Sequence, residues 1–107
     1  RLGVSEKRDP QIYVALADIH QKMIQEEPER RVYHEERSIH FLQAACKLEP
    51  TDAYLKYLLA KAYLRCGNLA LARRSFAVVR EMEPETYYGK AAAKLAHVKK
   101  LSFDAED

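Results

Sequence analysis

The residues closest to a chemical motif lie in the segment from His34 to Ser38, which reads His-Glu-Glu-Arg-Ser. A helical zinc site of the H-E-x-x-H type needs two histidines four residues apart on one face, with a glutamate beside the first as general base. Here Ser38 stands in the second ligand position, and His40 follows six residues after His34, away from the same helical face. We therefore interpret the segment as solvated polar residues of a helix and expect no metal site.

The other residues that could do chemistry are isolated. We expect His20 and His97 to pack between helices, each with a hydrogen-bonded ring nitrogen, rather than to form a metal pair. Cys46 and Cys66 lack a C-x-x-C pattern and an evident base, so we expect them to act as small buried helix residues. The chain has no glycine-rich phosphate loop and no G-x-S-x-G motif. The sequence thus predicts a protein that is not an enzyme, with no cofactor and no small-molecule substrate.

Composition and charge bound the remaining classes. With 107 residues the chain is long enough for one compact domain, and three glycines and four prolines are too few for an all-β sandwich rich in tight turns. The net charge is +2, and the basic residues occur in scattered pairs, so nucleic-acid binding is not favoured. No run of about 18 apolar residues is present, so we expect no membrane span.

The cysteines and the first residue suggest where the protein works and how it is organised. Two lone cysteines do not indicate a disulfide scaffold, and no signal peptide is recognisable, so we expect a reducing, cytoplasmic location. Because the chain begins with Arg1 rather than methionine, we also expect it to be a segment of a longer protein.

Helix signals punctuate the chain. Asp9-Pro10 reads as an N-cap followed by proline at the first helical position, and Pro28 and Pro50 interrupt the helical periodicity. Gly67-Asn68 combines a C-terminal glycine with a residue that can cap the next helix. We expect five helices, over about residues 10–27, 32–48, 51–66, 69–82 and 85–101.

An internal repeat of 34 residues relates two of these helices and their flanks. The segment 42–54 aligns with the segment 76–88, so that each proline, glutamate and tyrosine pair is 34 residues apart: Pro50 with Pro84, Glu49 with Glu83, and Tyr54 with Tyr88. A helix pair of this period cannot bury its apolar side alone and must stack on a neighbour.

The chain therefore resembles the tetratricopeptide repeat family. The consensus of that family has a small residue and an aromatic residue in its helix A, a glycine at the turn, an alanine and an aromatic residue in its helix B, and a closing proline. These positions are filled in order and at the family spacing by Ala60, Tyr63, Gly67, Ala72, Phe76 and Pro84. The resemblance implies that Tyr63 and Phe76 fill the space between the two helices, and that small residues at Ala17, Ala60, Ala72 and Ala93 let helices approach closely.

The resemblance implies an all-α fold of antiparallel helix pairs in a right-handed superhelix, with about two repeats and a terminal helix. The repeat domain covers residues 9–101, with repeat 1 at about 10–50, repeat 2 at about 51–84 and the terminal helix at about 85–101. An N-terminal arm (1–8) and an acidic tail (102–107) flank it. Between the matches to helix A and to helix B of repeat 1, the chain has about nine extra residues, and no glycine occurs at the turn. We expect an enlarged inter-helix loop over 26–32, or else a longer first helix.

In this family the A helices line a concave groove that holds extended or helical segments of other proteins. The family's groove positions fall here on Gln11, Val14, Asp18 and Gln21, on Tyr54, Tyr57, Lys61, Leu64 and Arg65, and on Tyr88, Ala91 and Leu95. The members that bind chaperone tails clamp a carboxylate with lysine, asparagine and arginine. The corresponding residues here are Val14, Asp18, Leu58, Tyr88 and Ala92, so the resemblance does not imply chaperone-tail binding.

The spacing of the third helix supports a groove independently. Tyr54, Tyr57, Lys61 and Leu64 recur at three and four residues and share one stripe, while Leu55, Leu59, Ala62 and Tyr63 supply a separate buried side. Tyrosine and arginine are also frequent binding hot spots. The alternative is that Tyr54 and Tyr57 simply pack against the neighbouring A helix.

These observations predict an adaptor or scaffold that binds a peptide segment of a partner protein. Lys61 and Arg65 suggest that the segment has acidic character. One alternative is self-association through the terminal helix, whose alanine-rich face comprises Ala91, Ala92, Ala93 and Ala96. A less favoured alternative is RNA binding by a related helical-repeat family, against which the consensus residues and the scattered charge count.

Overall fold

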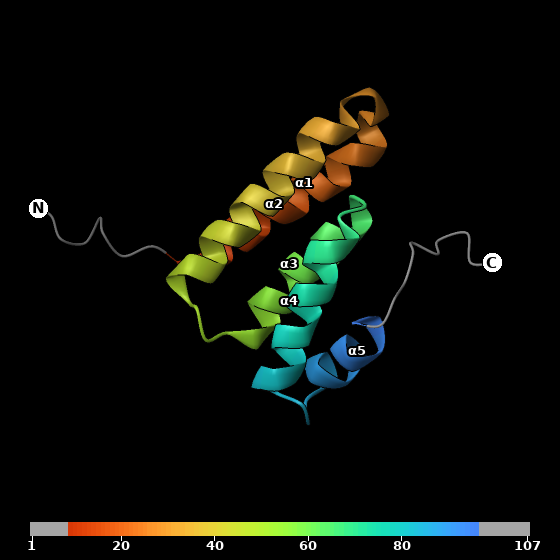
Figure 1. The fold of residues 1–107 in the computed structure, drawn as a ribbon. Coiled ribbons are helices and arrows are strands. Elements are labelled where there is room, and N and C mark those ends of the chain that lie inside the picture. The colour runs from red at the N-terminus through yellow and green to blue at the C-terminus, as the bar shows by residue number, and fades with distance from the viewer. Residues whose placement is uncertain (1–8, 97–107) are drawn as a thin grey trace, which may run out of the picture. The chain divides into compact units, whose positions relative to one another are not determined.

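The computed structural model describes residues 9–96, which form helices joined by short turns (Figure 1). The elements of this range are α1 (Pro10–Glu26), the 3-10 turn η2 (Pro28–Arg30), α2 (Arg31–Leu48), α3 (Ala53–Arg65), α4 (Leu69–Met82) and α5 (Tyr87–Leu95). No strand occurs in this part of the chain. The predicted all-α class, built from helix pairs, is confirmed.

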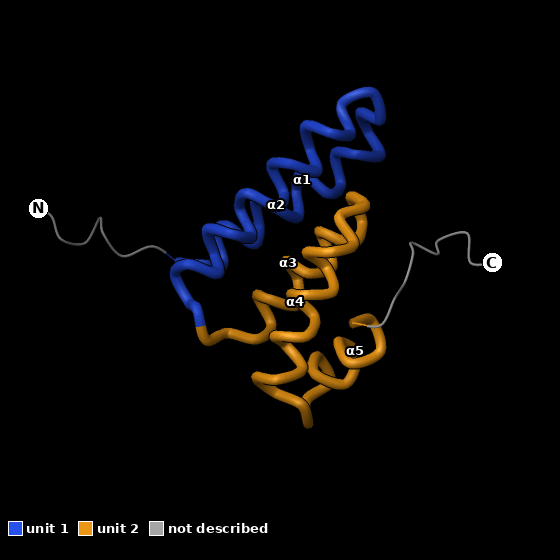
Figure 2. Tube along the Cα trace, viewed as in Figure 1, with its two compact units in different colours: residues 1–50 blue, residues 51–107 orange. Residues whose placement is uncertain are grey.

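The helices group into two compact units, residues 1–50 and 51–107 (Figure 2). In the first unit α1 packs against α2, and η2 closes the hairpin between them. In the second unit α3 packs against α4, while α5 packs against α4 and also contacts α3. Each unit therefore contains one helix pair, and the second has an additional helix.

The predicted caps begin the helices as expected. The carboxylate of Asp9 accepts a hydrogen bond from the backbone N–H of Gln11 at 2.9 Å, and Asn68 caps α4 by accepting from the backbone N–H of Leu71. Asp52, which was not predicted as a cap, caps α3 by accepting from the backbone N–H of Leu55. Gly67 has a φ of 92°, a conformation that glycine adopts without steric cost. The start of α3, the turn at Gly67 and the start of α4 are thus all marked by interactions between residues that are close in the sequence.

The core of the second unit confirms the consensus positions. Phe76 on α4 is completely buried, and Tyr63 on α3 is also buried. The small side chains of Ala60 on α3 and Ala72 on α4 are buried as well. Ala17 is buried in the first unit, whereas Ala93 is only half-buried and its neighbour Ala92 takes the buried place on α5. Small residues thus occur where helices approach, with a shift of one position on α5.

Of the two alternatives for residues 26–32, the enlarged loop is wrong, and the structure has the longer first helix. α1 continues to Glu26, η2 makes one turn, and α2 begins at Arg31. Pro28 fits the first position of the turn because no backbone N–H is needed there, and Arg30 N–H donates to the carbonyl of Glu27 at 2.8 Å. The extra residues lengthen both helices: α1 and α2 have 17 and 18 residues, against 13 and 14 in α3 and α4.

The interpretation of His34–Ser38 as solvated residues is also wrong for its two ends. His34 and Ser38 are 3% and 0% exposed, on the side of α2 that faces α1. They are buried because the lengthened α1 supplies hydrogen-bonding partners, His20 and Gln21, directly opposite. Glu36 between them is exposed.

The C-terminal part of the prediction is only partly covered. α5 begins at Tyr87, two residues later than expected, because the Thr86 hydroxyl caps it by accepting from Gly89 N–H at 3.1 Å. The expected continuation of this helix to Leu101, His97 and the acidic tail lie outside the described residues. Within residues 9–96, no helix is both long and apolar enough to cross a membrane.

We predict that Phe76→Ala lowers the free energy of unfolding by roughly 3–5 kcal/mol, because it truncates a large side chain that is completely buried. Urea unfolding followed by circular dichroism measures the loss. Val78→Ala on the same helix is the control, since Val78 is exposed and should change stability by less than about 0.5 kcal/mol. Equal effects of the two substitutions would contradict the packing described.

Candidate functional site

Three tyrosine rings from two helices meet on one side of the second unit. The ring of Tyr88 on α5 lies 5.1 Å from that of Tyr54 and 5.9 Å from that of Tyr57, both on α3. Tyr54 is 40% exposed, whereas Tyr57 is 7% exposed and its ring also packs edge-on against Phe76 at 6.1 Å. We call the surface formed by Tyr54, Tyr57, Lys61, Arg65 and Tyr88 the α3–α5 face.

A basic group adjoins the aromatic rings of this face. The Lys61 ammonium lies 5.3 Å from the centroid of the Tyr57 ring, within the range of a cation–π interaction. Arg65 follows one turn later and is exposed. Burial raises the pKa of the Tyr57 phenol, and the neighbouring Tyr87 phenol acts in the same direction. Tyr57 is therefore a neutral hydroxyl at physiological pH, and the face has positive charge.

The position of Tyr88 depends on a close backbone approach at Gly89. Gly89 is buried at the start of α5. A Cβ atom at this position would overlap the carbonyl oxygen of Glu83 and would lie 2.9 Å from Cα of Pro84. The Thr86 hydroxyl donates to the carbonyl of Glu83 at 3.0 Å and closes the same turn. The turn and the glycine together hold α5 close enough for Tyr88 to reach the α3 rings.

A model of the tetratricopeptide repeat family matches residues 36–95, more than half of the chain. The chain belongs to the tetratricopeptide repeat family. The match includes most of α2 and all of α3, α4 and α5. Comparison with curated proteins and with solved structures found no match. Tetratricopeptide repeats are non-enzymatic units that generally mediate interactions between proteins.

The structure brings together the predicted groove residues of two repeat helices. Tyr54 and Tyr57 on α3 contact Tyr88 on α5. This is the contact expected from the alternative interpretation, in which the two tyrosines pack against the neighbouring A helix. This packing buries Tyr57, whereas Tyr54 and Arg65 are exposed to solvent. The remaining predicted residues of α3 and α5 are half-buried: Leu64, Ala91 and Leu95.

The predicted groove residues of α1 belong to the first unit. Gln11 is exposed and Val14 is half-buried. Two of the four make contacts within their own unit: the Gln21 amide donates to the Ser38 hydroxyl at 3.1 Å, and Asp18 pairs with Lys22 at 3.2 Å. Gln21 is thus engaged with α2, and the other three stay predicted ligand contacts.

Tyr87 was not predicted as a site residue. It is the first residue of α5, is 75% exposed, and its ring lies 6.2 Å from that of Tyr88. The sequence signal that could have identified it is the Tyr-Tyr pair directly after a capping threonine. Tyr87 adds an exposed aromatic side chain beside the α3–α5 face.

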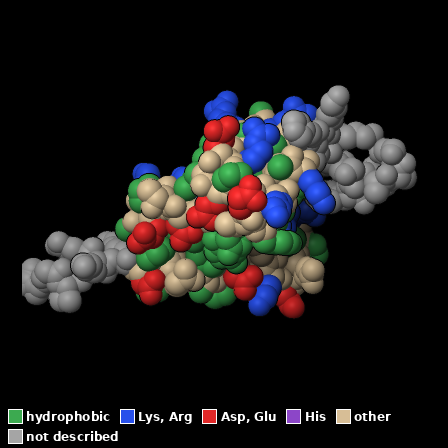
Figure 3. All heavy atoms as spheres, turned by 90° about the horizontal axis from the view of Figure 1, so that it is seen from below, with side chains coloured by type: hydrophobic (Ala, Val, Ile, Leu, Met, Phe, Trp, Pro, Cys, Tyr) green, Lys and Arg blue, Asp and Glu red, His purple; other side chains and the backbone are tan. Residues whose placement is uncertain are grey.

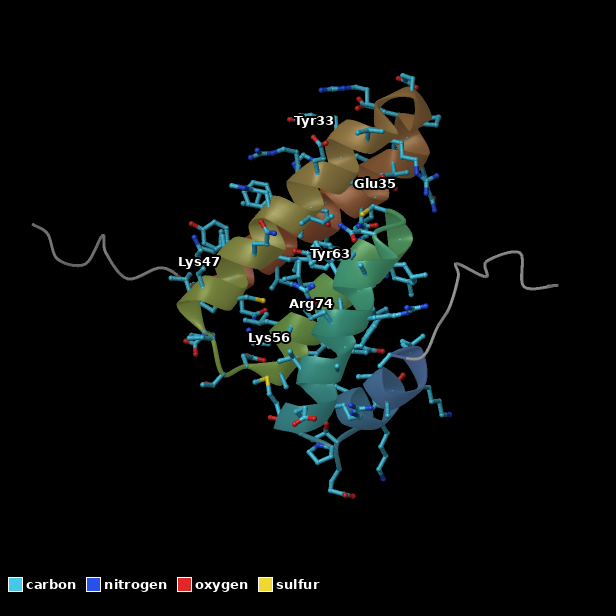
Figure 4. The ribbon with its side chains drawn as sticks, viewed as in Figure 1. Tyr33, Glu35, Lys47, Lys56, Tyr63 and Arg74 are labelled. Atoms are coloured by element: carbon cyan, nitrogen blue, oxygen red, sulfur yellow. The ribbon has the colours of Figure 1, made fainter. Side chains whose placement is uncertain are left out.

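Charge is distributed unevenly along the second unit. No aspartate or glutamate occurs between Asp52 and Glu81. The basic residues of that interval are Lys56, Lys61, Arg65, Arg73, Arg74 and Arg80, of which Lys56 and Arg74 are labelled in Figure 4. Within residues 51–96, the acidic residues are Asp52, just before α3, and Glu81, Glu83 and Glu85, around the α4–α5 turn. The charged side chains of α3, and those of α4 up to Arg80, are therefore all basic.

In residues 9–96, no three histidine, cysteine or carboxylate side chains converge on a point that could hold a metal ion. On the face drawn in Figure 3, apolar side chains reach the surface among charged side chains of both signs. The α3–α5 face is therefore the best-defined candidate site.

We predict that Gly89→Ala destabilises the second unit by about 1–3 kcal/mol, because the added methyl group meets backbone atoms that cannot rotate away. A destabilising effect is informative, because helix propensity alone favours alanine over glycine by about 1 kcal/mol and would therefore predict stabilisation. Urea unfolding measures the change, with Lys90→Ala at the exposed neighbouring position as control. A stabilised Gly89→Ala protein would show that α5 does not pack this closely on its turn.

Proposed function

We propose that this tetratricopeptide repeat chain is an adaptor that holds an acidic peptide segment of a partner protein against the α3–α5 face. The observation on which the proposal depends is the combination of clustered tyrosine rings with Lys61 and Arg65 on a helix that lacks acidic residues.

The chemistry of the face suits a peptide that is both apolar and acidic. Tyr54 and Tyr87 present exposed rings with hydroxyl tips, which can contact apolar side chains and still bond to a peptide backbone. Tyr54, Lys61 and Arg65 are spaced by seven and four residues and so lie along one stripe of α3. A carboxylate of the ligand would pair with the two basic groups, while an apolar side chain beside it would contact the rings.

Self-association is the alternative use of the same unit. Its expected contact surface was the alanine-rich side of α5, but Ala92 is completely buried inside the unit and Ala91 and Ala93 are half-buried. These residues already serve the packing of α5 on its own neighbours. The α3–α5 face, with its exposed rings and basic groups, is better suited to a different chain.

The test is affinity capture from cell extract, with and without ribonuclease treatment, read by mass spectrometry. The three baits are the wild-type domain, a charge-reversed variant of the α3–α5 face and a charge-reversed control. We expect the Lys61→Glu, Arg65→Glu double variant to lose at least tenfold of the partner that the wild-type domain captures. The loss should follow from reversed charge beside the rings, and wild-type capture should weaken with added salt.

The matched control is Lys56→Glu, Arg74→Glu, which makes the same charge change at basic residues outside the α3–α5 face. It should capture the partner as the wild type does. If both double variants capture the wild-type set, or both lose it equally, the α3–α5 face is not the binding site. A partner lost only on ribonuclease treatment would support RNA binding instead, and a concentration-dependent mass in light scattering would support self-association.

A further inference from the structure

A buried polar cluster joins the two helices of the first unit. His34 on α2 is 3% exposed, and both of its ring nitrogens have partners. Its Nε2 lies 2.9 Å from Oε1 of Glu27, and its Nδ1 lies 2.9 Å from Nδ1 of His20 on α1. The same Glu27 oxygen lies 3.5 Å from the Arg30 guanidinium. The cluster is at the end of the hairpin, beside η2.

Only one hydrogen can occupy the space between the two Nδ1 atoms. Glu27 is an acceptor, so Nε2 of His34 bears a hydrogen and donates to it. When both rings are neutral, Nδ1 of His34 must then accept, and Nδ1 of His20 must donate. The geometry therefore requires His20 in the Nδ1–H form and His34 in the Nε2–H form.

The first added proton is compatible with this arrangement. The added proton binds Nε2 of His20, and the hydrogen between the two Nδ1 atoms moves to His34, which then donates from both nitrogens, to Glu27 and to Nδ1 of His20. A second proton places N–H groups on both Nδ1 atoms at 2.9 Å, where neither can accept. Both imidazole rings are then positively charged and lie side by side, and Glu27 is the carboxylate that contacts His34.

The charged groups around His20 oppose its protonation. Besides His34, Arg37 from α2 and Arg30 from η2 act on it, and its ring packs against Tyr33 and Phe41 of α2, at 5.8 Å in both cases. Burial, and then the charges of His34, Arg37 and Arg30, lower the pKa of His20 below its ordinary value. Figure 4 labels Tyr33, which lies near the start of α2.

We infer that the His20–His34 pair makes the α1–α2 hairpin a pH-sensitive device, closed while the pair holds at most one extra proton and opened at its η2 end at mildly acidic pH. In the unfolded chain His20 titrates near its ordinary value of about 6.5. Because its pKa is lower in the folded state, the unfolded state binds more protons below that pH. Stability of the hairpin is thus present above about pH 6.5 and is lost as the pH falls.

Thermal unfolding of the whole chain between about pH 7.5 and 5.5 tests the device. We expect the wild-type Tm to fall by about 5–10 °C, which corresponds to roughly a tenfold change in the unfolding equilibrium constant. His20→Asn keeps a polar group near the position of Nδ1 but does not titrate, and it should lose less than half of that shift. His40→Asn, at an exposed histidine of α2, should keep the full shift. Equal shifts in all three proteins would overturn the inference.

The tautomers give a readout that does not depend on any variant folding. Long-range proton–nitrogen NMR spectra of the wild-type chain at about pH 7.5 should show His20 as the Nδ1–H form and His34 as the Nε2–H form. If both rings are in the Nε2–H form, the bond between the two Nδ1 atoms does not exist and the inference is wrong. Titration should show the His20 signals changing together with those of the η2 backbone, whereas a static η2 during protonation of both rings would also overturn it.

Discussion

Every helix of this chain depends on a second helix that covers its apolar side. Isolated helices of 9 to 18 residues are marginal in water, and the conformational entropy of ordering them is offset only when apolar surface is buried. The pairing within each unit supplies that burial. In the second unit Phe76 and Leu55 are the largest side chains with no exposed surface, and alanines at positions 60 and 72 leave room for them. The caps define where the helices begin, but packing decides whether they persist.

The same requirement explains why the α3–α5 face has the form it has. α5 has only nine residues, and it is held by its contact with α4, by the Thr86 cap and by the backbone approach at Gly89. Tyr88 is positioned by this packing and in turn positions the rings of α3. The rings that pack α5 against α3 thus include the rings that we propose as ligand contacts. Tyr57 is mainly structural, whereas Tyr54 keeps a free side.

The first unit buries polar as well as apolar side chains between its two helices. Its lengthened hairpin buries His34 and Ser38, although burying polar groups opposes folding unless each has a partner. In the part of the chain that the structure describes, no buried side-chain nitrogen or oxygen lacks a partner. Such a satisfied cluster specifies the register of α1 against α2, because apolar contacts alone would tolerate sliding. Its histidines also make the pairing sensitive to protons, which an aliphatic core would not be.

The sequence alone determined the helix class, the caps at Asp9 and Asn68, the turn at Gly67 and the consensus core around Phe76. These features follow from local chemistry and from a 34-residue period, both of which are visible in the order of residues. The spacing of three and four residues along α3 also identified Tyr54, Tyr57 and Lys61 as candidate ligand-binding residues. Sequence reasoning could not distinguish ligand contact from packing for Tyr57, because that depends on where another helix places Tyr88.

Tertiary structure decided what local patterns leave open. The segment 26–32 could have been a loop or helix ends, and packing of two long helices selected the helices. His34 and Ser38 look like solvent-facing residues on α2, and only the partners opposite them on α1 make their burial favourable. Tyr87 and Gly89 likewise acquire their roles from the turn at residues 83–84. Periodicity encodes which residues share a helix face, whereas the identity of the group facing each residue exists only after the helices have packed.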